Sequence, residues 1–166
     1  MEKKDLDWGN IGFSYMPTDK RYVANYKDGA WDEGGMTSDP NVVINECAGI
    51  LQYCQEIFEG LKAYTTEDGS IVTFRPDLNA ERMMDSARRL EMPPFPKVVK
   101  ANAAWVPPFG SGATLYLRPY MFATGPVIGV KPSQEYQFRL FGTPVGPYFK
   151  GGAKPLTLCV SDFDRA

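Results

Sequence analysis

Two Asp-Gly pairs constrain the fold of this chain more than any other feature, because each lies between short segments that can form strands. Asp28-Gly29 separates residues 22–26 from the segment that begins at Ala30, and Asp68-Gly69 lies inside residues 61–74, before the β-branched run at residues 71–73. An Asp-Gly pair is a strong signal for a tight turn between antiparallel strands. The sequence therefore predicts two β-hairpins.

Two other segments have helical periodicity. Apolar residues recur at spacings of three and four over residues 45–58, which predicts an amphipathic helix with its apolar face on a sheet. A second helix is predicted from Asp77 or Asn79, either of which is a good N-cap, to Met92, where Pro93-Pro94 ends it. Further strands are predicted at residues 114–122, 135–142 and 156–160. Helices inserted among antiparallel strands indicate an α+β fold, an antiparallel sheet with helices packed on it.

The domain boundary is predicted near the C-terminus. Gly151-Gly152 followed by Lys154-Pro155 is typical of a linker. We therefore expect residues 1–150 to form one small domain, residues 151–155 to form an interdomain linker, and residues 156–166 to begin a larger cofactor domain that the chain does not complete.

Composition excludes several classes of function. Eighteen basic and twenty acidic residues give a net charge of -2, and no basic block is present to bind nucleic acid. The chain contains no histidine and no Cys-x-x-Cys pair among its three cysteines, so we predict no metal site, Ser-His-Asp triad or Cys-His dyad within it. No apolar run is long enough for a membrane helix, and the first residues lack a signal core, which predicts a cytoplasmic protein.

Three polar side chains are candidates for binding an anion. Arg82 lies one turn inside the second predicted helix, where a helix N-terminus and a guanidinium both favour a phosphate. Tyr116 and Arg118 lie two apart on a predicted strand and so share a face. Spacing alone favours a solvated surface arginine at 82 and a solvent-facing pair at 116 and 118.

Three motifs in order change these interpretations: Phe58-Glu59-Gly60-Leu61-Lys62-Ala63-Tyr64, then Phe74-Arg75-Pro76-x-Leu78-Asn79-x-x-Arg82, then Tyr116-x-Arg118-Pro119. With Tyr53, they resemble the N-terminal half of branched-chain amino acid aminotransferases, which are class IV pyridoxal-phosphate enzymes of fold type IV. The resemblance runs from about Leu6 to Ala166. It implies transfer of the amino group of leucine, isoleucine or valine to 2-oxoglutarate through pyridoxal 5′-phosphate.

The resemblance also implies roles for individual residues. Arg82 matches the arginine that holds the cofactor phosphate, and Arg118 matches one associated with the side-chain carboxylate of glutamate or 2-oxoglutarate, which we expect near water. The substrate-binding residues it implies are Tyr53, Phe58, Tyr116, Arg118, Val130 and Tyr148. Since family members are homodimers, Val130 is expected to reach the neighbouring subunit's site.

No catalytic residue is expected within the chain, because the family's Schiff-base lysine lies beyond the equivalent of Ala166. The chain alone is therefore expected to be inactive. Lys62 is interpreted as a structural residue of a strand, and Glu46, Glu56 and Glu59 as charges on a helix surface. The alternatives are another class IV enzyme, either a D-amino acid aminotransferase or an aminodeoxychorismate lyase, and a non-catalytic ligand-binding module. The motifs at residues 58–64 and 116–118 favour the branched-chain enzymes.

Overall fold

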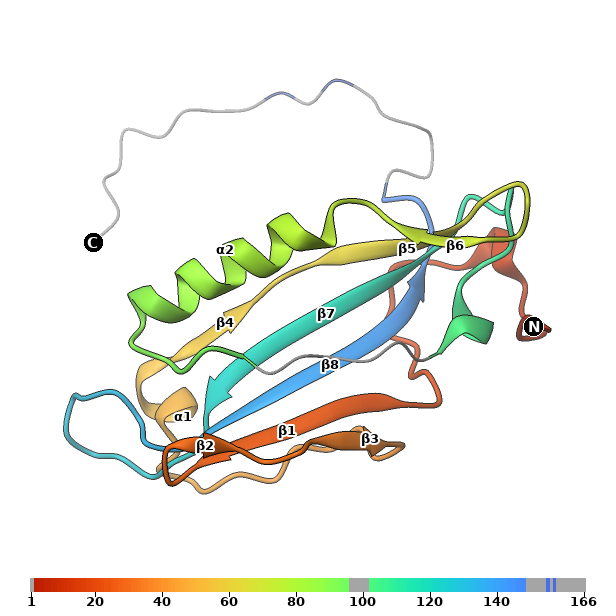
Figure 1. The fold of residues 1–166 in the computed structure, drawn as a ribbon. Coiled ribbons are helices and arrows are strands. Elements are labelled where there is room, and N and C mark those ends of the chain that lie inside the picture. The colour runs from red at the N-terminus through yellow and green to blue at the C-terminus, as the bar shows by residue number, and fades with distance from the viewer. Residues whose placement is uncertain (1, 96–101, 149–154, 156, 158–166) are drawn as a thin grey trace.

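The computed structural model describes residues 2–95, 102–148, 155 and 157, which build a curved antiparallel sheet with one long helix against it (Figure 1). The strands are β1 (Arg21–Lys27), β2 (Ala30–Trp31), β3 (Gly35–Thr37), β4 (Glu56–Phe58), β5 (Leu61–Thr65), β6 (Ile71–Thr73), β7 (Thr114–Ala123) and β8 (Tyr136–Val145). The helices are α1 (Gly49–Tyr53) and α2 (Pro76–Arg89), with single 3-10 turns η1 (Trp8–Asn10) and η2 (Ala103–Trp105). The predicted α+β architecture is confirmed.

The long strands β7 and β8 form the centre of the sheet. The order is β2-β1-β8-β7-β5-β6, with β3 beside β1 and β4 beside β7, and all the pairings are antiparallel. β4 and β5 follow β7 in one register, with Phe58 opposite Tyr120 and Leu61 opposite Leu117. The segment from β4 to β5 therefore runs as one interrupted strand along β7, and this segment carries the first sequence motif.

Both predicted hairpins are present at the Asp-Gly pairs. β1 and β2 are joined by Asp28 and Gly29, with φ values of 51° and 83°, as a two-residue turn between antiparallel strands requires. β5 and β6 are joined by a longer turn in which Gly69 also has a positive φ of 83°.

The turn predicts a specific cost for one substitution. Gly29→Ala should lower the free energy of unfolding by about 1 kcal/mol, because an L side chain disfavours the left-handed backbone that Gly29 adopts. Urea denaturation measures this, with Gly35→Ala as the control because Gly35 is a glycine without a positive φ. An unchanged stability in Gly29→Ala would contradict this assignment of the turn.

The first predicted helix, residues 45–58, is wrong in extent. α1 covers only Gly49–Tyr53, since Cys54 takes a left-handed conformation with φ 51° and its N–H bonds to the carbonyl of Ile50. The chain then enters β4 and pairs with β7. The pairing imposes a period of two, which buries Ile57 and leaves its neighbours exposed, and so overrides the helical spacing read from the sequence.

The second predicted helix is confirmed, but its caps are not those expected. α2 begins at Pro76, whose fixed φ suits the first helical position, and Arg75 rather than Asp77 or Asn79 is the N-cap. Arg75 makes no side-chain cap and instead forms an ion pair with Asp77, at 2.7 Å.

α2 ends before Met92, at Arg89, in a hydrogen-bonded C-terminal motif. Glu91 is left-handed with φ 53°, and the N–H of Met92 donates to the carbonyl of Ala87 at 2.9 Å. This is the Schellman arrangement, which satisfies the last carbonyls of the helix.

The core lies between α2 and one face of the sheet. Met83 and Ala87 are the buried residues of α2. The buried cluster that they join comprises Tyr22, Ala24, Ile57, Met92, Met121, Ala123, Tyr136 and Phe138. Because side chains alternate along a strand, Met121 on this face places Tyr116 and Arg118 of β7 on the other.

The predicted linker and the strand expected at residues 156–160 lie outside the described residues, apart from residues 155 and 157, so the domain boundary stays a prediction. In the part of the chain that is described, no helix has the length and apolar character needed to cross a bilayer.

Candidate functional site

Phe58, Tyr116 and Arg118 meet on the sheet face that is turned away from α2, and we call them the Arg118 cluster. Nη2 of Arg118 donates a hydrogen bond to Oη of Tyr116 at 2.7 Å. The guanidinium carbon of Arg118 lies 4.3 Å from the centre of the Phe58 ring and 5.3 Å from that of Tyr116. The predicted side-by-side placement of Tyr116 and Arg118 is therefore present, and register between β4 and β7 adds Phe58 to it.

Arg118 has unused hydrogen-bonding capacity. Its Nε is buried without a partner, and no salt bridge to its guanidinium exists among the described residues. Cation–π contact offsets part of the cost of a half-buried charge, but an unsatisfied buried donor still costs about 1–3 kcal/mol. The arrangement therefore favours an incoming carboxylate.

Gly60 allows Tyr116 to adopt its place in this cluster. A Cβ added at Gly60 would lie 2.2 Å from Oη of Tyr116 and 2.9 Å from its Cζ, far inside van der Waals contact. The phenol ring therefore rests against the bare backbone of residue 60, which only glycine provides at this position.

Arg82 lies on the other side of the sheet, in a group that we call the Glu59 cluster: Glu59, Asn79 and Arg82. Nε and Nη2 of Arg82 donate to the two carboxylate oxygens of Glu59 at 2.5 and 2.6 Å, and Nδ2 of Asn79 donates to Oε2 of Glu59 at 2.8 Å. The Arg82 side chain is 69% exposed, whereas that of Glu59 is only 6% exposed. The exposed guanidinium of Arg82 is thus bound to a buried carboxylate.

The interpretation of three glutamates as helix-surface charges is wrong. Glu46 lies in a turn before α1, and Glu56 is exposed on β4. Glu59 continues the alternation of β4 and so points to the same face as buried Ile57, toward α2. Its N–H bonds to the carbonyl of Pro119 at 2.9 Å, which fixes its backbone to β7.

The Glu59–Arg82 pair predicts a dependence of stability on pH. The hydrogen bond from Arg82 holds the pKa of Glu59 below its usual value of 4.5. A carboxylate whose pKa is lower in the folded state stabilises the protein above the unfolded pKa, and this contribution is lost as the pH falls through the folded pKa. Glu59→Gln should therefore destabilise the chain more at pH 7 than at about pH 3. Urea denaturation at both pH values tests this, and an equal loss at both would contradict it.

Tyr53 and Val130 lie at the far end of β7. Oη of Tyr53 donates to the carbonyl of Ile128, in the β7–β8 loop that also carries Val130, which is 88% exposed. The end of β7 at Ala123 is five residues from Arg118, about 17 Å along the strand. The structure thus brings Tyr53 to the loop of Val130 and not to the Arg118 cluster.

Tyr148 contacts the N-terminal segment, whereas Lys62 lies beside the Arg118 cluster. The exposed ring of Tyr148 packs edge-to-face on Phe13, with ring centres 5.4 Å apart. Lys62 is a half-buried residue of β5 opposite Tyr116. Lys62 also lines a cavity of about 280 Å³ beside β5, and its structural interpretation stays a prediction.

A cavity of about 280 Å³ links the two clusters at the edge of β5. It is lined by Gly60, Leu61, Lys62, Tyr64, Phe74, Asn79 and Tyr116. Tyr116 belongs to the Arg118 cluster and Asn79 to the Glu59 cluster, so both groups border one mostly apolar space beside the N-terminal end of α2.

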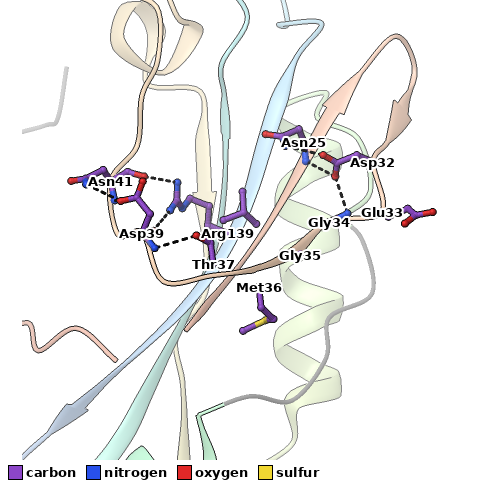
Figure 2. A pocket seen from close by; sticks show the side chains of 11 residues that line it. Asn25, Asp32, Glu33, Gly34, Gly35, Met36, Thr37, Asp39, Asn41 and Arg139 are labelled. Atoms are coloured by element: carbon purple, nitrogen blue, oxygen red, sulfur yellow. Dashed lines mark hydrogen bonds between the residues drawn. The ribbon is translucent and has the colours of Figure 1, made fainter. Parts of the chain in front are cut away.

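A larger and more open cavity, about 550 Å³, lies along β1 and β3 (Figure 2). Its polar groups bond to one another: Asp32 accepts from Asn25 and from the N–H of Gly34, and Arg139 donates to the carbonyls of Asp39 and Asn41. None of the predicted site residues lines it. These bonds hold the segment after β2 against the sheet.

Comparison with known proteins identifies the family. No family model matches the chain. A branched-chain-amino-acid aminotransferase of Haemophilus influenzae is 53% identical over 172 residues, in an alignment covering 98% of this chain and 50% of that protein. The corresponding protein of Helicobacter pylori is 44% identical over 174 residues, covering 98% of this chain and 51% of its own length. The chain belongs to the branched-chain-amino-acid aminotransferase family. It spans about half the length of these curated relatives.

Solved structures of branched-chain aminotransferases share its fold. The Escherichia coli enzyme superimposes with a TM-score of 0.54 at 20% identity, over 76% of this chain and 40% of that one. The Thermoproteus uzoniensis enzyme with norvaline gives a TM-score of 0.54 at 21% identity, over 79% and 43%. A third solved branched-chain aminotransferase, with pyridoxamine 5′-phosphate, gives a TM-score of 0.51 at 19% identity, over 78% and 42%.

In this member of the branched-chain-amino-acid aminotransferase family, Glu59 and Gly60 are parts of the candidate site that the sequence patterns above do not predict. The signal for Glu59 was its spacing of two from Ile57, which indicates the same strand face once β4 is recognised as a strand. Gly60 is indicated only by its place in the motif at residues 58–64, because its role depends on contact with Tyr116 of another strand. Among the residues that the structure describes, no group of three potential metal ligands occurs.

Proposed function

We propose that this chain supplies the N-terminal part of an aminotransferase that moves the amino group of leucine, isoleucine or valine to 2-oxoglutarate by means of pyridoxal 5′-phosphate. The observation that carries the proposal is the state of Arg118. It is a half-buried arginine that stacks on Phe58 and bonds to Tyr116, with one buried N–H unpaired and no carboxylate partner among the described residues.

This arrangement meets a chemical requirement of such an enzyme. One pocket must accept an aliphatic side chain in one half-reaction and the carboxylate of glutamate in the other. The rings of Phe58 and Tyr116 offer apolar surface to leucine, while their π faces keep Arg118 stabilised when no anion is present. When glutamate enters, the guanidinium can form charge-assisted hydrogen bonds with its carboxylate.

Arg82 is our candidate for the phosphate anchor. The guanidinium of Arg82 has five N–H groups, of which Nε–H and one on Nη2 bond to Glu59. Three N–H groups therefore remain for an anion. The exposure of Arg82 and the neighbouring cavity of about 280 Å³ fit a group that carries an aromatic ring and a phosphate. When bound, pyridoxal 5′-phosphate supplies the electron sink for transamination, and these residues would hold and orient it.

We further propose a cytoplasmic homodimer in which Val130 reaches the neighbouring subunit's site. The support is the position of its loop, which is exposed, held by the Tyr53 hydroxyl and about 17 Å along β7 from Arg118. At this distance Val130 does not reach the Arg118 cluster of its own chain. It can reach a substrate pocket only in a neighbouring subunit. Sedimentation analysis of a chimaera, in which this chain is followed by the uncovered part of the Haemophilus influenzae relative, should give a dimer. A monomer with full activity would contradict this.

The proposal is tested in a chimaera in which this chain is followed by the part of the Haemophilus influenzae relative that it does not cover. With 2-oxoglutarate as acceptor, the chimaera should use L-leucine faster than D-alanine. A preference for D-alanine would contradict the branched-chain assignment and favour a D-amino acid aminotransferase. A folded chimaera without transaminase activity toward either would favour a non-catalytic ligand-binding module.

The chain alone is expected to produce no measurable transamination of L-leucine, since in its family the Schiff-base lysine follows the equivalent of Ala166. The assay uses the purified 166-residue chain with added pyridoxal 5′-phosphate. A sustained rate from this chain would show that a lysine within it, with Lys62 as the first candidate, can take the catalytic role.

A further inference from the structure

We propose that Glu59 is a positioning residue, which fixes the guanidinium of Arg82 so that its uncommitted N–H groups face the phosphate of pyridoxal 5′-phosphate. This inference rests on the proposed function, in which Arg82 is the phosphate anchor. It assigns a role to a carboxylate that has no place in the substrate pocket and lies on the opposite face of the sheet from Arg118.

The guanidinium of Arg82 has one edge bound to Glu59 and another end that Glu59 leaves free. Glu59 binds the Nε–Nη2 edge of Arg82 side-on through both carboxylate oxygens, at 2.5 and 2.6 Å. Such a fork leaves the Nη1 end pointing away from the carboxylate. Because the Glu59 side chain is 6% exposed and that of Arg82 is 69% exposed, the buried partner holds and the exposed end is presented to solvent.

Besides its contact with Arg82, Glu59 is held at two points. Its N–H bonds to the carbonyl of Pro119 on β7, which fixes the backbone, and Nδ2 of Asn79 bonds to Oε2, which fixes the carboxylate plane. Asn79 and Arg82 are one turn apart on α2, so the carboxylate bonds to both from one helix face. The carboxylate thus ties α2 to the interrupted strand between β4 and β5 and sets the direction of Arg82.

A competing role for Glu59 predicts the opposite result. If the carboxylate were an internal anion that occupies Arg82 until phosphate replaces it, then removing its charge would tighten phosphate binding. If it positions Arg82, its removal leaves a long side chain free among its rotamers, and ordering that side chain then opposes binding. The two roles therefore differ in the sign of one measured effect.

The test measures the dissociation constants of pyridoxal 5′-phosphate and of pyridoxal, which lacks the phosphate, in the chimaera. Glu59→Gln should weaken pyridoxal 5′-phosphate binding about ten- to thirtyfold, the equivalent of the rotamer freedom of one arginine, and leave pyridoxal binding unchanged. Asn79→Ala, which removes one hydrogen bond to the carboxylate, should weaken pyridoxal 5′-phosphate binding by a smaller factor and leave pyridoxal binding unchanged. This variant replaces Glu59→Gln in the test if Glu59→Gln does not fold. Glu81→Gln, an exposed carboxylate on the same helix, is the matched control and should change neither constant.

Each outcome decides between the roles. Tighter or unchanged binding of pyridoxal 5′-phosphate in Glu59→Gln, or an equal loss for both ligands, overturns the positioning role. Arg82→Gln separates this from a failure of the proposed function. If Arg82→Gln weakens pyridoxal 5′-phosphate binding while Glu59→Gln does not, only the positioning role is wrong. If Arg82→Gln has no effect, the phosphate anchor is wrong and the positioning role is overturned with it.

Discussion

Replacing Arg118 by glutamine is expected to lower kcat/KM for glutamate and 2-oxoglutarate in the chimaera by about 100-fold or more, and that for leucine by less than about threefold. Each hydrogen bond to a charged group contributes about 1.5–3 kcal/mol, and two of them are lost when the guanidinium is removed. Leucine makes no such bonds, and the apolar surface of Phe58 and Tyr116 stays in place. Single-turnover measurements, which follow the cofactor absorbance with each of the three substrates separately, give the three constants.

The matched control for this substitution is Arg88→Gln. Arg88 is an exposed arginine on α2 that pairs with Asp85 at 2.6 Å, so its loss removes the same charge far from the Arg118 cluster. Both amino acids should react in this variant at their original rates. If Arg118→Gln slowed leucine as much as glutamate, Arg118 would have a general structural role and the proposed selectivity would be wrong.

Gly60→Ala is expected to lower kcat/KM for leucine and glutamate alike, by about 100-fold. The new methyl group would lie 2.2 Å from Oη of Tyr116, so the ring must move by more than about 1 Å and the hydrogen bond from Arg118 is lost. A displacement of this size at a substrate-positioning residue costs about two orders of magnitude in rate. Steady-state kinetics of the folded variant, checked by circular dichroism, measures it.

Two further variants make the Gly60 result specific. Gly35→Ala is the control, since a Cβ there meets nothing within 4 Å among the described residues. In a Tyr116→Phe background the hydroxyl that gives the closest contact is absent, so adding Gly60→Ala should cost less than it does in the original chain. Equal costs in both backgrounds would show that Gly60 acts through something other than Tyr116.

The parts of the fold that could be predicted from sequence are those set by local signals. The Asp-Gly turns give both hairpins, and the proline that opens α2 lies one residue before Asp77 and three before Asn79, the two predicted starts. β4 could not be predicted in the same way, because Ile57 and Phe58 lie at helical spacing from α1 and become a strand only through pairing with β7. Long-range pairing decided this segment against its local pattern.

The candidate site shows the same division. The shared face of Tyr116 and Arg118 follows from the period of a strand, and the structure agrees. Contacts between separate elements, such as Phe58 on Arg118 and Tyr53 on the β7–β8 loop, depend on register and loop path, which the sequence does not encode locally. Glu59 was misassigned for this reason, since its face depends on recognising β4.

We propose that this chain carries the phosphate anchor of the cofactor at Arg82 and the carboxylate site of the substrate at Arg118, on opposite faces of one sheet. A crystal structure of the chimaera with pyridoxal 5′-phosphate and glutamate tests both roles at once. Hydrogen bonds are expected from Arg82 to the cofactor phosphate, with Glu59 still on its other edge, and from Arg118 to the side-chain carboxylate of glutamate. A phosphate bound away from Arg82, or a glutamate carboxylate that Arg118 does not contact, would contradict the proposal.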